Sequence, residues 1–239
     1  MPHTLNLWRH GLGTVPDSVW QRTDLRVLIL ADNGLTDLPP AVAGLRHLTT
    51  LDLGHNALTE VPEEIGLLTD LTDFLYLHDN RIDELPDTLG RLTRLRYLNL
   101  GENTLARLPD TLGDMTGLIE LRAQHNVLTA LPDSIGRLHH LRELWLRGNP
   151  LDRLPASFAA LRELRHLDLR GNSFTEVPPA LTGLPLLRHI DLRSNGLTQL
   201  PSWLAELPSL EKLDLRWNEI DPDLPLLATL ERQGCVVLV

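Results

Sequence analysis

The stretch Leu164–Leu186, LRHLDLRGNSFTEVPPALTGLPL, recurs with small substitutions from one end of the chain to the other. Its skeleton is Leu-x-x-Leu-x-Leu-x-x-Asn-x-Leu-x-x-Leu-Pro-x-x-Leu-x-x-Leu, and the step between copies is 23 residues. A fixed period of this length predicts an array of stacked structural repeats. The asparagine marks the register at Asn33, Asn56, Asn80, Asn103, Asn126, Asn149, Asn172, Asn195 and Asn218, with one step of 24 residues after Asn56.

Each copy predicts one short strand and one short helix. The Leu-x-Leu alternation is typical of a strand whose leucines point inward. The asparagine that follows is a turn residue whose amide can bond to backbone groups. Leu-Pro then ends the turn, and a segment such as Pro62–Leu68 predicts a helix with proline near its first position. Copies stacked in parallel predict a curved α/β solenoid, with strands on the concave face and helices on the convex face.

The pattern resembles the leucine-rich repeat family, in the 23-residue Leu-Pro type found in Ras-pathway scaffolds, plant relatives and many bacterial proteins. The resemblance covers essentially all 239 residues. It implies a right-handed horseshoe with a buried asparagine ladder, no catalytic domain and no cofactor. It also implies a non-enzymatic module that binds a protein through its concave face.

The unbroken period predicts a single domain over residues 1–239, because each repeat needs its neighbours to bury a face. We divide it into an atypical first repeat (1–24), nine regular repeats (25–220) and a C-terminal cap (221–239). In the first repeat His10 replaces the asparagine, and Trp8 and Trp20 either shield the end of the core or flank an edge that pairs with another molecule. In the cap we expect a helix over Leu226–Gln233 and a strand over Cys235–Val239 that buries the cysteine.

Composition narrows the partners and the compartment. A net charge of −10 argues against a nucleic acid ligand, and no apolar run approaches the length of a membrane helix. The first residues show no secretory signal, and a single cysteine leaves no pair for a disulfide within the chain. We therefore expect a cytoplasmic protein, a monomer or a dimer through its N-terminal edge.

The one irregular step falls in the segment LTDFLYLHDN, Leu71–Asn80, where one residue more than the period requires is present. One extra residue in a strand is what a β-bulge needs, and bulges often redirect side chains near functional sites. A neutral insertion is the alternative interpretation.

Outward strand residues predict two zones on the concave face. Aromatic residues make up only 4% of the chain, yet four of them fall on this face near its middle, and such residues often dominate binding energy. With the residues beside them, this aromatic zone comprises Phe74, Tyr76, His78, Tyr97, Arg122 and Trp145. The second, the Asp/Arg zone, comprises Arg147, Asp168, Arg170, Asp191, Arg193, Asp214 and Arg216. It is either a self-neutralised ladder of ion pairs or a patch for a charged partner. As partner-binding residues we predict the six of the aromatic zone together with Arg147, Asp168 and Arg170.

A third set, the rim column, stands just before the asparagines and holds Asp32, His55, Asp79, Glu102 and His125. Carboxylates and imidazoles are zinc ligands, so a metal- or small-ligand-binding protein is an alternative function, although no dedicated ligand spacing is present. Phosphate-loop, nucleophile-elbow and metalloprotease motifs are absent from the sequence, so we predict no enzyme. A homo-oligomeric assembly through the N-terminal edge is the remaining alternative.

Overall fold

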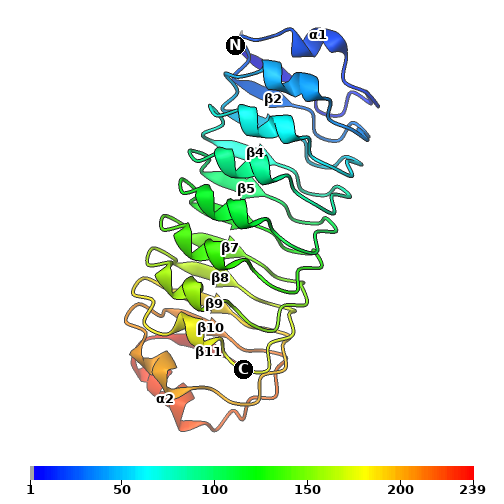
Figure 1. The fold of residues 1–239 in the computed structure, drawn as a ribbon. Helices are drawn as coiled ribbons and strands as arrows, with labels where there is room; N and C mark the ends of the chain where they lie inside the picture. Colours follow the sequence, from blue (N-terminus) through cyan, green and yellow to red (C-terminus); the bar gives the residue numbers. More distant parts are fainter. Residues whose placement is uncertain (1–2) are drawn as a thin grey trace.

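The computed structural model describes residues 3–239. Within them, eleven strands form one parallel sheet in sequence order, and the chain winds as a stack of coils (Figure 1). The strands are β1 (Thr4–Asn6), β2 (Val27–Ile29), β3 (Thr50–Asp52), β4 (Phe74–Tyr76), β5 (Tyr97–Asn99), β6 (Glu120–Arg122), β7 (Glu143–Trp145), β8 (His166–Asp168), β9 (His189–Asp191), β10 (Lys212–Asp214) and β11 (Val236–Leu238). The predicted α/β solenoid with a parallel sheet is confirmed.

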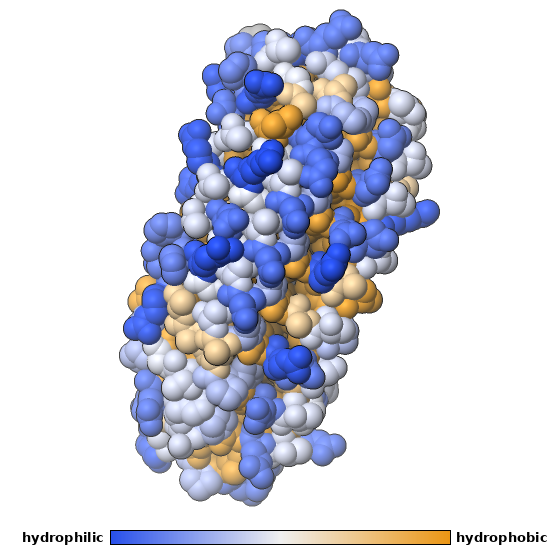
Figure 2. Space-filling model, viewed as in Figure 1, coloured by the Kyte–Doolittle hydropathy of each residue, from blue (hydrophilic) through white to orange (hydrophobic). Residues whose placement is uncertain are grey.

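Short helices cover the side of the stack opposite the sheet. They are α1 (Asp17–Trp20), the 3-10 helices η1 (Pro40–Gly44), η2 (Glu63–Leu67), η3 (Asp87–Arg91), η4 (Asp110–Asp114), η5 (Asp133–Arg137), η6 (Ala156–Ala160), η7 (Pro179–Leu181) and η8 (Ser202–Glu206), and α2 (Pro225–Arg232). A proline in extended conformation precedes each regular 3-10 helix, as Pro109 does for η4. No helix of residues 3–239 has the length and apolar character needed to cross a membrane. Seen from the helix side, the surface is largely hydrophilic, with a narrow apolar stripe along its length (Figure 2).

The glycines of these helices serve packing between helices. A Cβ atom on Gly113 would lie only 2.3 Å from the carbonyl oxygen of Ser134 in the next helix. Gly90 stands in the same relation to Thr111, at 2.4 Å. Any side chain there would therefore push successive coils apart.

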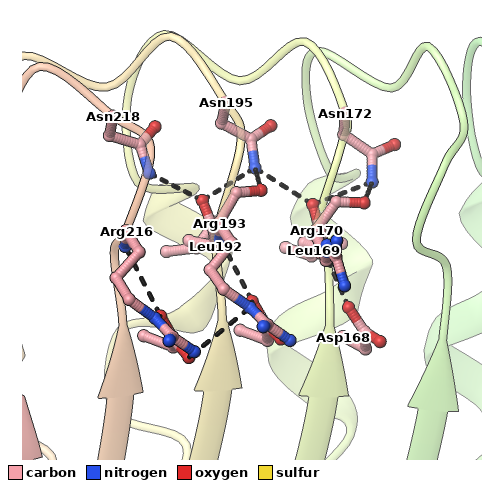
Figure 3. A network of polar contacts seen from close by, with 11 residues as sticks. Asp168, Leu169, Arg170, Asn172, Leu192, Arg193, Asn195, Arg216 and Asn218 are labelled. Carbon is pink, nitrogen blue, oxygen red and sulfur yellow. Dashed lines mark hydrogen bonds and ion pairs between the residues drawn. The ribbon is translucent and has the colours of Figure 1, made fainter. Parts of the chain in front are cut away.

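The asparagines form the buried ladder that the family resemblance implied. The amide of Asn126 donates to the carbonyls of Leu100 (3.0 Å) and Ala123 (3.2 Å), and its Oδ1 accepts the N–H of Leu105 (3.0 Å). Equivalent bonds recur along the stack, and Figure 3 shows those of Asn172 and Asn195. The asparagine ladder provides hydrogen-bond partners for backbone groups that lie beyond the ends of the strands and are still buried. The coils can stack closely because these groups are paired.

The two ends of the core close differently. At the N-terminal end Trp20 is buried and packs into the core, whereas Trp8 is 51% exposed. At the C-terminal end α2 and β11 follow the predicted order, and Cys235 is buried as expected. Burial raises the pKa of the Cys235 thiol, which fits a packing residue.

The extra residue of the fourth repeat lies at the entrance to β4, not inside it. Strand β4 pairs in regular register with its neighbours, Phe74 opposite Thr50 and Tyr97. Just before it, Thr72 and Asp73 each accept one backbone N–H, from Arg96 and Tyr97, where other repeats use one carbonyl for both. The extra residue is accommodated before the strand, so the prediction of a bulge within the strand was wrong. Phe74 and Tyr76 therefore remain aligned with the equivalent outward residues of the neighbouring strands.

Candidate functional site

The aromatic zone forms a continuous set of ring contacts on the outer face of the sheet. Phe74 is 42% exposed, and its ring centroid lies 5.8 Å from that of Tyr76 and 5.5 Å from that of Tyr97. Tyr76 and Tyr97 are 5.1 Å apart. Successive side chains of a strand point to opposite faces of the sheet, and the leucine between each pair of outward residues is buried. These rings therefore lie on the concave surface.

His78 extends the zone toward the rim. Its ring lies 5.9 Å from Tyr76 and 4.7 Å from His55, across the backbone of Gly54, whose missing side chain leaves the space. Burial, and then the charge of His55, lowers the pKa of His78. The imidazole is therefore neutral at neutral pH and continues the apolar surface.

Arg122 joins the tyrosines to Trp145. Its guanidinium carbon lies 5.7 Å from the ring of Tyr97 and 5.2 Å from that of Trp145, and its Nε donates to Glu120 at 2.5 Å. On the far side Trp145 stacks on His166 at 4.3 Å. Burial raises the pKa of Tyr97 to about 12, so its phenol stays uncharged. The zone thus runs from β4 to β8 as one surface of rings with one bridging cation.

Several polar atoms of this face have no hydrogen-bond partner among the described residues. They are His78 Nδ1, Gln124 Oε1, Trp145 Nε1 and Arg147 Nε, all inaccessible to solvent. Such groups are few in folded proteins, and each is destabilising by about 1–3 kcal/mol. Three further atoms of this kind, the hydroxyl oxygens of Thr111, Ser134 and Ser157, lie in helices on the opposite side, so unpaired atoms occur on both sides of the stack.

The Asp/Arg zone is closed by ion pairs at its C-terminal end (Figure 3). Arg193 donates to both oxygens of Asp191 and lies 3.4 Å from Asp214, which Arg216 also contacts, at 2.7 Å. Burial acts to raise the pKa of Asp214, but the hydrogen bonds of Arg216 and the charge of Arg193 lower it overall. The self-neutralised ladder predicted as one alternative is present on β9 and β10.

Asp168 does not have the exposed, partner-contacting position that we predicted from the sequence. It is only 4% exposed, and its Oδ1 accepts the backbone N–H of Arg170 at 3.0 Å. Asp191 does the same for Arg193, at 3.1 Å, so the aspartate closes the turn at the strand end. Burial raises the pKa of Asp168, and the backbone bond to Arg170 opposes this without reversing it. Its carboxylate is a structural group and offers little surface to a partner.

The residue types of the rim column follow from the backbone conformation at these positions. All five of its members have positive φ, from 51° for Asp79 to 58° for Asp32 and Glu102, and aspartate and histidine tolerate this conformation better than most residues. Asp32 pairs with Arg9, and His55 with Asp79 at 2.6 Å. Over residues 3–239 no three His, Cys, Asp or Glu side chains come together in a way that would hold a metal ion. The hypothesis of a metal site therefore has no support from the geometry.

One residue of this face was missed in the sequence. Trp217 occupies the rim column four repeats beyond His125, the last copy considered, is 63% exposed and has φ 62°. The guanidinium carbons of Arg170, Arg193 and Arg216 lie 5.5, 5.9 and 5.5 Å from its ring. A bulky side chain in a column of Asp, His and Gly was the available signal.

A separate groove of about 920 Å³ lies away from the sheet, beside η2, η3 and η4. Val61, Leu85 and Leu108 form its floor. Its other side chains are mostly acidic, among them Glu60, Glu63, Glu64, Asp83, Glu84, Asp87 and Asp110. None of the predicted site residues lines it.

Family models agree with this geometry over most of the chain. A leucine rich repeat model matches residues 3–58, 23–82 and 73–128, and a leucine-rich repeat region model matches residues 129–223. The chain belongs to the leucine-rich repeat family, whose fold typically serves protein–protein interaction. No curated protein matches it.

Solved structures extend the comparison. The ectodomain of the Arabidopsis thaliana receptor kinase GASSHO1/SCHENGEN3, in complex with Casparian strip integrity factor 2, is 32% identical over 91% of this chain, with a TM-score of 0.78. The ectodomain of the Arabidopsis receptor kinase HAESA, in complex with an IDA peptide hormone ligand, is 29% identical over 92%, also with a TM-score of 0.78. The Toll–Spatzle complex of Drosophila, at 24% identity over 92% and a TM-score of 0.69, shares the fold. This chain spans only 27%, 39% and 35% of those three chains.

Proposed function

We propose that this protein is a non-enzymatic interaction module that binds a protein partner on its concave face. The observation that carries the proposal is the series of ring contacts from Phe74 to His166, bridged between Tyr97 and Trp145 by the guanidinium of Arg122, on the outer surface of the sheet. The binding residues are those of the aromatic zone, Phe74, Tyr76, His78, Tyr97, Arg122 and Trp145, together with Arg147 and Arg170.

The chemistry of these side chains supports the proposal. Tyrosine and tryptophan bury a large area with little loss of rotamer freedom, and they are enriched among the residues that dominate binding energy. The guanidinium of Arg122 adds a cation between the rings. Two of the similar structures were solved with bound protein or peptide ligands, which supports the same class of function for this chain.

The proposal is tested by affinity purification followed by mass spectrometry with three forms of the protein. The variant Tyr76→Ala with Trp145→Ala removes two rings from the concave face. The control, Leu67→Ala with Leu186→Ala, removes two exposed apolar side chains that lie outside the sheet. We expect the wild type and the control to capture the same principal partner and the first variant to lose it. Capture by the first variant at the wild-type level would place the binding surface elsewhere.

Self-association through the N-terminal edge is a second candidate. Strand β1 pairs only with β2, and the half-exposed Trp8 lies beside it, under Arg9 at 4.6 Å. An unpaired strand edge with an exposed ring is a plausible self-pairing surface. Light scattering distinguishes the outcomes: a dimer that Trp8→Ala converts to monomer supports this candidate, and a wild-type monomer at high concentration removes it.

We also propose a cytoplasmic location, without nucleic acid or membrane partners. The single cysteine and the net charge of −10 support both parts. Fractionation of cells that express the protein at its natural level tests the location.

A further inference from the structure

Four arginines follow one another on adjacent strands at the C-terminal half of the concave face, and they fall into two pairs. Arg193 and Arg216 are bound to Asp191 and Asp214. Arg147 and Arg170 have no carboxylate within ion-pair distance among the described residues, and Arg147 Nε is buried without an acceptor. Arg147 and Arg170 occupy equivalent positions of successive repeats, whose strands are about 4.8 Å apart, and the guanidinium group of Arg170 lies over the ring of Trp217.

From its place in the sequence, Asp168 is the residue expected to form an ion pair with Arg147 or Arg170. In the structure it forms neither. The equivalent aspartates on β9 and β10 hold both the strand-end turn and an arginine side chain. The carboxylate of Asp168 accepts a hydrogen bond only from the backbone N–H of Arg170, and the charges of Arg147 and Arg193 act on it without forming an ion pair. Glu143, His166 and His189 on β7 to β9 are the other titratable groups nearby, and none is within ion-pair distance of Arg147 or Arg170. Two cationic groups are therefore left for a ligand from outside the chain.

Trp217 holds one of them in place. Its indole lies against Arg170, Arg193 and Arg216, and because it is 63% exposed it also presents a free ring surface. A guanidinium that stacks on an indole keeps its in-plane N–H groups available for a planar carboxylate. The exposed ring itself sits on a backbone conformation that is rare for a bulky residue.

We propose that Arg147 and Arg170 bind carboxylate side chains of a short acidic segment of the protein partner, with Trp217 in contact with the same segment. This inference rests on the proposed function and names the chemistry of the partner. Arginine pairs carboxylates bidentately, and such charge-assisted bonds are about twice as strong as neutral ones. The occupant is an acidic peptide, not a nucleic acid, because a long polyanion would meet Asp191, Asp214 and a chain of net charge −10.

A peptide library tests this without knowledge of the natural partner. Random twelve-residue peptides displayed on phage are selected on the wild-type protein, and the enriched sequences are synthesised for fluorescence anisotropy. Four variants are compared with the wild type: Arg147→Gln with Arg170→Gln, Trp217→Ala, Tyr76→Ala with Trp145→Ala, and a control. The control is Arg46→Gln with Arg91→Gln, which removes the same charge from two exposed arginines outside the strands.

We expect the selected peptides to be enriched in Asp and Glu and to lose affinity when these become Asn and Gln. The double arginine variant should weaken binding at least about tenfold, as expected for two lost charge-assisted bonds, and the control less than about twofold. Trp217→Ala should weaken binding about threefold. Circular dichroism confirms that each variant is folded.

The failures of the two proposals differ. Peptides without acidic enrichment, or acidic peptides that the double arginine variant still binds, overturn the acidic-segment inference. If Tyr76→Ala with Trp145→Ala loses those same peptides, the concave-face function stands. Peptides that neither variant loses contradict both proposals. Tighter binding of a dT12 oligonucleotide than of the peptides, abolished in the double arginine variant, would assign the arginines to nucleic acid and also overturn the inference.

Discussion

The aromatic zone and the closed part of the Asp/Arg zone use the same outward positions of neighbouring strands but satisfy them in opposite ways. On β9 and β10 each carboxylate accepts bonds from an arginine and a backbone N–H, so the polar groups there are paired. From β4 to β7 the rings contact one another and leave buried donors such as Trp145 Nε1 unpaired. The difference teaches that one concave face combines a region that stabilises the stack with a region that remains open to a partner.

The largest effect on stability is expected where the ladder of ion pairs on β9 and β10 is broken. Asp214→Ala leaves Arg193 and Arg216 without their shared carboxylate, which is 3% exposed, and should lower the free energy of unfolding by about 3 kcal/mol. Urea denaturation measures this. The matched control is Glu84→Ala, whose exposed pair with Arg107 should contribute less than about 1 kcal/mol. Equal, small losses for both variants would show that the ladder does not stabilise the fold.

A smaller effect on stability is expected in the aromatic zone. Tyr76→Ala removes ring contacts with Phe74 and Tyr97 and should destabilise by about 1.5 kcal/mol, the upper end for aromatic pairs. Thermal denaturation beside Asp214→Ala provides the comparison. If the tyrosine variant lost as much stability as the aspartate variant, the aromatic zone would have to be regarded as structural.

Two equivalent aspartates should respond to pH with opposite signs. The pKa of Asp214 is lowered in the folded state, so its contribution is present above the ordinary value of 3.8 and is lost as pH falls through the lowered pKa. The pKa of Asp168 is raised, so its ionisation destabilises the fold as pH rises from 3.8 through the raised pKa.

Asp214→Asn should therefore be less stable than the wild type at pH 7. Asp168→Asn should be more stable there, because it removes the cost of ionising a buried carboxyl. Both differences should shrink at low pH in urea titrations. A destabilised Asp168→Asn at pH 7 would mean that the charges of Arg147 and Arg193 stabilise this carboxylate more than its burial destabilises it.

The smallest effect is local. A Cβ atom on Gly54 would lie 2.4 Å from the ring of His78, so Gly54→Ala should displace the imidazole toward solvent. Its pKa should then rise toward the ordinary value of 6.5, because burial is the main cause of its lowering. An NMR titration of the His78 ring proton measures the change. Gly196→Ala, where the nearest atoms are 3.6 Å away, should leave this titration unaltered, and an unchanged curve in Gly54→Ala would show that the ring does not depend on the glycine.

Much of this arrangement could be predicted from residue spacing. The inward leucines, the asparagine ladder, the terminal cap and the columns that bring Phe74 beside Tyr97 all follow from a period near 23 residues. The insertion before β4 was misplaced because spacing alone does not say where an extra residue is absorbed. The packing role of the helix glycines could not be predicted for a similar reason: contact between Gly113 and the next coil is a property of the stack.

What the sequence by itself determined is the repeat, its strands and the order of residues along each column, because a repeated pattern of inward leucines has one efficient way to bury them. Only the tertiary structure decided which outward side chains are paired, which are buried and which are left open. Asp168, Asp191 and Asp214 have the same sequence context, yet they differ because hydrogen bonding depends on side-chain directions between repeats that no spacing specifies. The exposure of Trp217 over three arginines was decided in the same way, by packing across repeats.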